Sequence, residues 1–172
     1  MRKSVVLCLV AAAMAVPAMA RNTEYKLPLA DVLQSPEAKA RLDDSVKFYF
    51  GEKSMPAGAE PKGFDVISRI SNAAKLRARA AANSFGGGPP PINSGRATSQ
   101  QTDDIDDCKI AALDLLVEMQ RKAKQVGANA VVDFVSYYRN VTFSSATEYE
   151  CHAGGTGSHI TFKATYSVLP KS

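Results

Sequence analysis

The sequence predicts an α+β fold: a small, mostly antiparallel sheet of four or five strands, one long helix packed on it, and a disulfide between them. Three observations predict it. Residues 104–126 have the periodicity of an amphipathic helix, residues 147–169 that of a β-hairpin, and each segment holds one cysteine, Cys108 or Cys151. The chain has 172 residues, of which 45% are hydrophobic and 22% charged, so it can bury one modest core.

The first twenty residues have the pattern of a secretory signal peptide. Arg2 and Lys3 precede a nearly uncharged apolar run, and the run ends in AMA at Ala20, a sequence that a signal peptidase accepts. As a helix the run would rise ~20 Å, which is short of the ~30 Å hydrocarbon core of a membrane. Cys8 lies too early in the run to serve in lipid attachment. We therefore expect cleavage after Ala20, no stable membrane span, and a periplasmic or secreted protein.

Charge and cysteine content narrow the function of residues 21–172, which we expect to form one domain. This part keeps 19 Lys and Arg, two fewer than the 21 of the whole chain, against 17 Asp and Glu, so its net charge is +2. Nucleic-acid binding relies on neutralising many phosphates, so this charge does not favour it. Only Cys108 and Cys151 remain, and an even number of cysteines in an exported chain indicates one disulfide.

Shorter patterns predict the elements before the long helix. Ser35 followed by Pro36 is typical of a helix start, because serine accepts from free N–H groups and proline fits the first helical position. Residues 45–50 and 64–70 are rich in β-branched and aromatic side chains and predict strands. Residues 73–82 are rich in alanine and predict a short helix. Residues 77–101 form a Gly/Pro-rich insert, flexible where it lacks a periodic apolar face.

The long helix is expected to carry two apolar faces and an acidic start. Its main face holds the residues that fall within ~60° of one direction, namely Cys108, Ala112, Leu115, Met119, Ala123 and Val126. A second patch of Ile110, Leu113 and Val117 lies opposite, to be covered by the N-terminal segment or by a second subunit. Four aspartates between Asp103 and Asp107 are expected to cap the start of the helix and favour its dipole.

The hairpin has a preferred register in which His152 pairs with His159. This register brings every large apolar residue to one face and pairs opposite charges on the other, with Cys151 opposite Ile160, Tyr149 opposite Phe162 and Glu148 opposite Lys163. It also aims Cys151 at the helix face that holds Cys108, and so predicts a disulfide between them. Closing this loop would stabilise the fold by ~4 kcal/mol.

The same register predicts a candidate metal site. His152 and His159 would stand side by side on the outward face, with Glu150 two residues from His152. Two imidazoles and a carboxylate could hold Zn²⁺ or Cu²⁺. The alternative is an exposed histidine pair without a ligand.

No sequence pattern indicates catalysis. The stretch GGGPPPINSG lacks the Gly-Lys-Ser/Thr ending of a phosphate-binding loop, and neither G-x-S-x-G nor H-E-x-x-H occurs. Cys151 and His152 would point to opposite faces of a strand, so they cannot form a nucleophile–base pair. We expect a protein that is not an enzyme, takes no organic cofactor and binds no ATP.

Several segments resemble a family of small exported proteobacterial proteins. These segments are LPLADVLQSPEAKARLD, VKFYFGE, AKQVGANAVVDFVSYY and SSATEYECHAG, and together they cover most of the chain after the signal, except roughly 77–101. Members are often automatically named excinuclease ATPase subunit, and the function of the family is not established. The residues do not support that name, because the chain has no nucleotide-binding or zinc-finger motif.

Two other groups of proteins show a weaker similarity to this chain. The similarity lies in the order of its segments: DDC, a helix, GANAV, a strand and a cysteine in the next hairpin. This order resembles that of the outer-membrane stress-sensing lipoprotein of the Rcs phosphorelay and of YbjQ-type domains. The first resemblance implies that Cys108 and Cys151 match a helix-to-sheet disulfide, although the second disulfide and lipobox of that sensor are missing. The second implies self-association, since YbjQ-type proteins form rings. We expect an envelope-associated binding or stress-related module, with an envelope protein or its own copy as partner.

Overall fold

The computed structural model describes residues 21–84 and 95–170. The expected signal peptide (1–20) and the centre of the expected insert (85–94) lie outside these residues. The elements follow the order β1 (Asn22–Pro28), α1 (Leu29–Leu33), α2 (Pro36–Arg41), β2 (Lys47–Phe50), β3 (Glu60–Ser71), α3 (Ala73–Ser84), α4 (Gly95–Gln125), β4 (Ala130–Ser136), the 3-10 turn η1 (Tyr138–Asn140), β5 (Glu148–Gly154) and β6 (Ser158–Val168).

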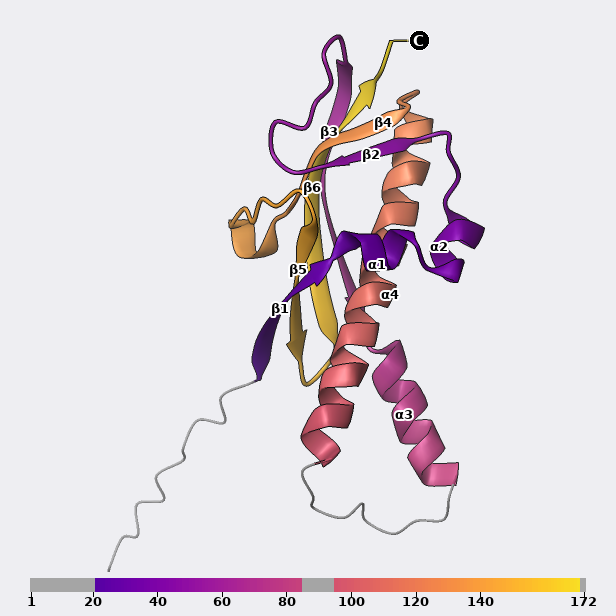
Figure 1. Ribbon diagram of the computed structural model, residues 1–172, viewed down its shortest axis with the longest axis vertical. Coiled ribbons are helices and arrows are strands. Elements are labelled where there is room, and N and C mark those ends of the chain that lie inside the picture. Colours follow the sequence, from indigo (N-terminus) through magenta and orange to yellow (C-terminus); the bar gives the residue numbers. More distant parts are fainter. Residues whose placement is uncertain (1–20, 85–94, 171–172) are drawn as a thin grey trace, which may run out of the picture.

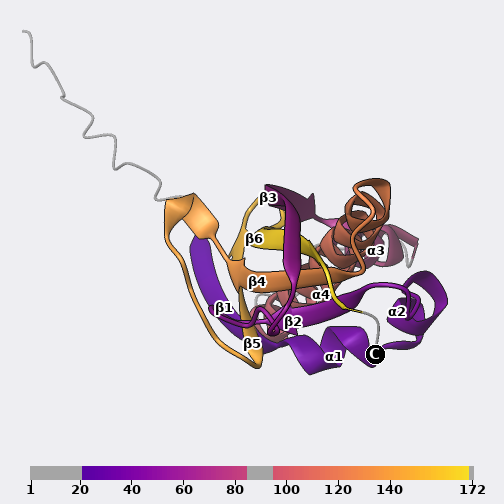
Figure 2. The same cartoon turned by 90° about the horizontal axis from the view of Figure 1, so that it is seen from above.

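The described strands form one curled sheet built around β6, with α4 lying across one face (Figures 1 and 2). β3 pairs with β6 along one side, while the other side of β6 pairs first with β5 and then with β4. β1 continues the sheet beyond β5, and β2 continues it beyond β4. Only the β2–β4 pair among these is parallel, so the predicted α+β class with a mostly antiparallel sheet and one long helix is confirmed.

β1 is the strand that the sequence reasoning did not predict. Its residues alternate between exposed and half-buried, and all seven pair with β5, from Asn22 opposite Gly154 to Pro28 opposite Glu148. Tyr25 and Leu27 pack against the core on the inner face. The alternation of polar and apolar residues in NTEYKLP was the available signal, and it makes the sheet six-stranded rather than four- or five-stranded.

The main apolar face of α4 is confirmed over most of its length. The predicted residues Cys108, Ala112, Leu115, Met119 and Ala123 are fully buried against the sheet. Val126 is exposed, contrary to the prediction, because α4 ends at Gln125 and the chain turns at Gly127 with a φ of +71°.

The N-terminal segment covers two of the three residues of the second apolar patch of α4, while Ile110 is only half-buried. Leu113 is buried, and Val117 packs against the same cluster as Leu29 and Val32 of α1. Ser35 starts α2 as expected, since its Oγ accepts a hydrogen bond from the Ala38 N–H at 3.1 Å.

The helices extend further into the expected insert than the composition indicated. α3 continues to Ser84, and α4 begins at Gly95 rather than near Asp104, so residues 95–101 are helical. The aspartates therefore lie inside α4, and the prediction that they cap its start is wrong. Asp107 instead caps α3, because its Oδ1 accepts from the Ala74 N–H at 2.9 Å and from the Ser71 hydroxyl at 3.1 Å.

Asp104 is the centre of a buried ion cluster. Its carboxylate is fully buried, with Arg21 at 2.7 Å from Oδ2, Lys75 at 2.9 Å from Oδ1 and the Tyr25 hydroxyl at 3.2 Å from Oδ2. Burial by itself raises the pKa of Asp104, but the hydrogen bonds and charges of Arg21 and Lys75 outweigh it and hold the pKa below its usual value. The cluster joins the start of β1 and the start of α3 to one turn of α4.

The predicted disulfide between Cys108 of α4 and Cys151 of β5 is confirmed. Their Cα atoms are 6.0 Å apart, and both residues are fully buried. Asp104 lies one turn before Cys108 on the same helix, so the ion cluster and the disulfide fasten neighbouring turns of α4 to the same end of the sheet. None of the helices within 21–84 and 95–170 is both long and apolar enough to cross a membrane.

Candidate functional site

A row of four residues crosses the outward face of the sheet, the face opposite α4. The strand pairings place Ile70 of β3 opposite His159 of β6, His159 opposite His152 of β5, and His152 opposite Glu24 of β1. Paired positions share a face of the sheet, so the four side chains lie on the same side. The predicted pairing of His152 with His159 is therefore confirmed.

The register is as predicted, but the predicted length of the hairpin is wrong, because β5 and β6 pair at only two positions, His152–His159 and Ala153–Ser158. Further along, the places opposite Phe162 and Lys163 are taken by Ser136 and Val135 of β4. β5 is linked to β4 there, since the Glu150 N–H donates to the Ser136 hydroxyl at 2.9 Å. The predicted inward direction of Tyr149 and Cys151 still holds, because both are fully buried.

His152 is buried rather than exposed, since η1 folds over it. The Tyr138 ring stacks on the imidazole with a centroid distance of 3.6 Å and an interplanar angle of 14°. Only 7% of His152 remains exposed. Its Nε2 lies 2.7 Å from Glu150 Oε1, while its buried Nδ1 has no hydrogen-bond partner among the described residues. His152 is thus held in a fixed orientation beside a carboxylate.

His159 contacts the same tyrosine but stands apart from the carboxylates. Its ring meets Tyr138 edge-on at 5.3 Å, and its Nε2 lies 3.5 Å from the Thr161 hydroxyl. Burial, together with the charge of His152, lowers the pKa of His159 below its usual value.

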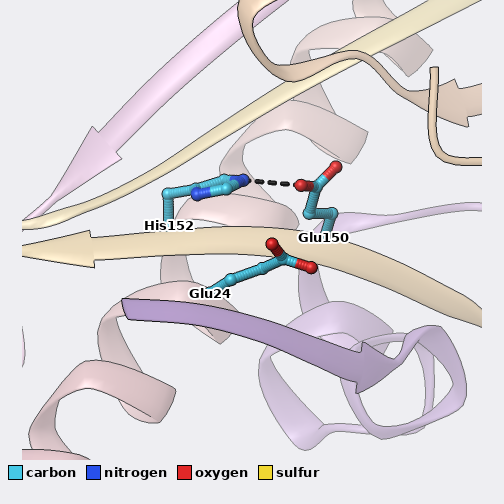
Figure 3. Close-up of side chains that lie close together, drawn as sticks. All are labelled: Glu24, Glu150 and His152. Atoms are coloured by element: carbon cyan, nitrogen blue, oxygen red, sulfur yellow. Dashed lines mark hydrogen bonds and ion pairs between the residues drawn. The ribbon is translucent and has the colours of Figure 1, made fainter. Parts of the chain in front are cut away.

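Glu24, Glu150 and His152 form the group that could hold a metal ion, and we call it the Glu24 cluster (Figure 3). One ligand atom from each lies within 4.8 Å of the others. Figure 3 shows His152 and Glu150 reaching toward each other on one strand, with the Glu24 carboxylate on the next. The sequence predicted His152 and Glu150 as ligands together with His159. Glu24 was missed because β1 was missed.

The chemistry of this cluster suits a transition metal better than calcium. An imidazole nitrogen with two carboxylates is a ligand set found for Zn²⁺, which binds such atoms at ~2.0–2.2 Å. The 2.7 Å contact between His152 Nε2 and Glu150 Oε1 is that of a hydrogen bond. Both atoms would therefore have to turn toward a common point near Glu24 to bind one ion.

A second feature of the outward face lies on β3. Phe64, Val66 and Ile70 are 62%, 42% and 61% exposed, and they lie on one face of the strand, with Ser68 between the last two. We call these three residues the β3 strip. β3 pairs only with β6 among the described strands, so its other edge carries no neighbouring strand there. The spacing of Phe64, Val66 and Ile70 by even numbers of residues is the signal in the sequence that they share a face, but it does not show which face of the sheet α4 leaves uncovered.

Comparisons of the chain with protein-family models, with curated proteins and with solved structures find no match. The structure itself defines a class: an α+β protein with a curled sheet, one long helix on its inner face and a disulfide from helix to sheet. The resemblances to the excinuclease-named family, the Rcs sensor and YbjQ-type domains stay predictions from the sequence.

Proposed function

We propose that this chain is an exported, non-enzymatic binding module of the cell envelope that binds a protein partner through the β3 strip. The strip is the observation that supports the proposal most directly. Single exposed apolar residues are ordinary on a protein surface, whereas contiguous apolar patches mark interaction sites. Three large apolar side chains on one face of one edge strand, with only Ser68 between Val66 and Ile70, make such a patch.

The disulfide supports the export part of the proposal. Disulfides such as Cys108–Cys151 persist in oxidising compartments and are rare in the reducing cytosol. Together with the signal sequence expected over 1–20, this favours a periplasmic or secreted location. A stress-related role, which the resemblance to the Rcs sensor implies, fits the same location.

The arrangement of reactive side chains supports a role without catalysis. Cys151 is committed to the disulfide on the inner face, while His152 is stacked under Tyr138 on the outer face. The two neighbours therefore cannot act together as nucleophile and base. The excinuclease and ATPase names receive no support from these residues, and neither ATP nor nucleic acid is part of the proposal.

Site-specific photo-cross-linking in the living cell tests the proposed surface. A cross-linking amino acid replaces Val66 in the strip, and in the control it replaces Val141, an exposed valine after η1. We expect a discrete cross-linked species from position 66 and none from position 141. Equal products from both positions, or none from position 66, would contradict the proposal.

The location is tested separately by the intact mass of protein from the periplasmic fraction. We expect a mass lacking residues 1–20, which rises by two hydrogens on reduction. An unprocessed mass, or a mass that reductant leaves unchanged, would contradict export with a disulfide.

A second candidate function is divalent metal binding by the Glu24 cluster. The observation that favours it is the buried, fixed His152 with two carboxylates within 4.8 Å. Titration calorimetry with Zn²⁺, and separately with Cu²⁺, near neutral pH tests it. We expect heat from the unaltered protein and from His159→Ala, but none from His152→Ala. If His159→Ala also lost binding, the ligand set predicted from sequence would be the better one, and no heat from the unaltered protein would exclude a metal function.

A further inference from the structure

We propose that the partner of the β3 strip is a second copy of this chain, joined edge to edge as an antiparallel strand pair centred on Ile67. The inference rests on the proposed function, because it names the occupant of the same strip. Three properties of β3 support it: the direction of its free backbone groups, the limits of its unguarded edge, and the placement of its charges.

The backbone groups of Phe64, Val66, Ser68 and Ile70 face the free edge. Alternate residues of an antiparallel strand direct their N–H and C=O groups to opposite sides. Thr161 of β6 directs its carbonyl away from β3, because that oxygen accepts from the Tyr137 N–H at 2.8 Å. The backbone N–H and C=O of Ser68, which pairs with Thr161, must then also point away from β6. The Val66 N–H is consistent with this direction, because it donates to the Asp65 carboxylate at 2.9 Å.

The unguarded part of the edge has definite limits. Proteins protect edge strands with proline, lysine and bulges, and β3 has all three near its start, at Pro61, Lys62 and the irregularity between Pro61 and Gly63. At its other end the chain leaves the sheet after Ser71 to begin α3. Residues 64–70 are left without proline, lysine or an irregularity, and the four residues of each copy whose backbone groups face the edge would form about eight main-chain hydrogen bonds.

The side chains of this stretch are self-complementary about Ile67. A two-fold axis there places Asp65 opposite Arg69 of the second copy, which pairs opposite charges twice. On the outward face it places Phe64 opposite Ile70, two exposed apolar residues.

Neighbouring registers lack this complementarity. Moving the axis to Val66 places Asp65 opposite Ile67, and moving it to Ser68 places Asp65 opposite Ser71. A partner of unrelated sequence would have no reason to match both the charges and the apolar residues, so the pattern favours a second copy.

Forming the pair requires one local change. Asp65 now accepts from the Val66 N–H through Oδ1 and pairs with Lys122 through Oδ2. Its Oδ1 must release the Val66 N–H, which then donates to a backbone carbonyl of the second copy. Arg69 of that copy replaces the lost contact of Oδ1, while Lys122 keeps its partner.

Charge reversal and mixing test the inference on the full exported chain with its disulfide intact. Analytical ultracentrifugation over a concentration series measures the dimer dissociation constant of the unaltered protein, of R69D and of D65R. Each variant alone places like charges opposite each other at both ends of the pair, and we expect the dissociation constant to rise about tenfold or more. An equimolar mixture of the two variants restores opposite charges, so we expect heterodimers at close to the original strength.

The controls separate this inference from the proposed function. Circular dichroism checks that both variants fold. D65R needs this check more than R69D, because it places a second positive charge beside Lys122. K62E, a charge reversal in the guarded part of β3, should leave the dimer unchanged. A monomer at every concentration, or a dimer that R69D does not weaken, would overturn the inference. A cross-link from Val66 to a different protein would then leave the proposed function standing without it.

Discussion

Replacing Asp104 by asparagine should destabilise the protein more than the same replacement at its exposed neighbour Asp106. The carboxylate lies between Arg21 and Lys75, with the Tyr25 hydroxyl beside it, and it is fully buried. The substitution Asp104→Asn would keep the shape of the side chain but remove its charge. Two cations would then share a site without their anion.

The structure sets the size of this effect. Removing one partner of a buried ion pair costs about 3–5 kcal/mol, because the remaining charge is left uncompensated. Here the Arg21 side chain is 33% exposed and that of Lys75 11% exposed, so Arg21 can regain water. The lower end of the range therefore applies, and we expect a loss of about 3 kcal/mol in the free energy of unfolding. For a domain of this size, that loss lowers Tm by about 6–12 °C.

Urea unfolding of D104N beside D106N measures the effect. Asp106 lies on the same helix but is exposed, so D106N should stay within about 0.5 kcal/mol of the unaltered protein. Equal stability of the two variants would refute the reasoning.

The pH dependence of the gap gives a second test. The pKa of Asp104 is lowered in the folded state, so its stabilisation is present above the unfolded value of about 3.9 and is lost as pH falls through the folded value. The gap between the unaltered protein and D104N should therefore close only in strong acid. A gap that persists there would mean that charge is not its cause.

Two further predictions concern the disulfide and the second histidine. Replacing both Cys108 and Cys151 by alanine should lower the free energy of unfolding by about 4 kcal/mol in urea, because the bond spans 43 residues; a loss below about 1 kcal/mol would contradict this. His159 should titrate by NMR below its ordinary pKa of about 6.5, since burial and the charge of His152 both lower it. Because the pKa of His159 is lowered in the folded state, its contribution to the free energy of unfolding falls as pH falls. In H152Q the pKa of His159 should rise only in part, because burial remains. No rise at all would exclude an effect of His152.

Features that depend on local periodicity could be predicted from the sequence. The apolar face of α4 and the direction of Cys151 each follow from the repeat of one element, and together they predict the disulfide. The pairing of His152 with His159 depends on a short turn, which also acts locally.

Features that depend on distant strands could not be predicted in this way. Whether β6 continues with β5 or changes to β4 is decided by the curl of the sheet and by the competition of two strands for one edge. The place of Glu24 depends on β1 pairing with a strand more than a hundred residues later in the chain. Tyr138 covers His152 only because η1 folds back over the sheet. The candidate site was therefore predicted in its local part, His152 and Glu150, and missed where β1 completes it.

The contacts that fasten the fold lie on the inner side of the sheet, and this predicts which substitutions the protein tolerates. The disulfide and the Asp104 cluster both attach α4 to the hairpin end, while the β3 strip faces the other way. Phe64→Ser should then leave the free energy of unfolding within about 0.5 kcal/mol, yet abolish the cross-link from Val66. Phe162→Ser, at a fully buried phenylalanine on the adjacent strand, should cost at least about 3 kcal/mol. If both variants were destabilised alike, the strip would be part of the core and not a binding surface.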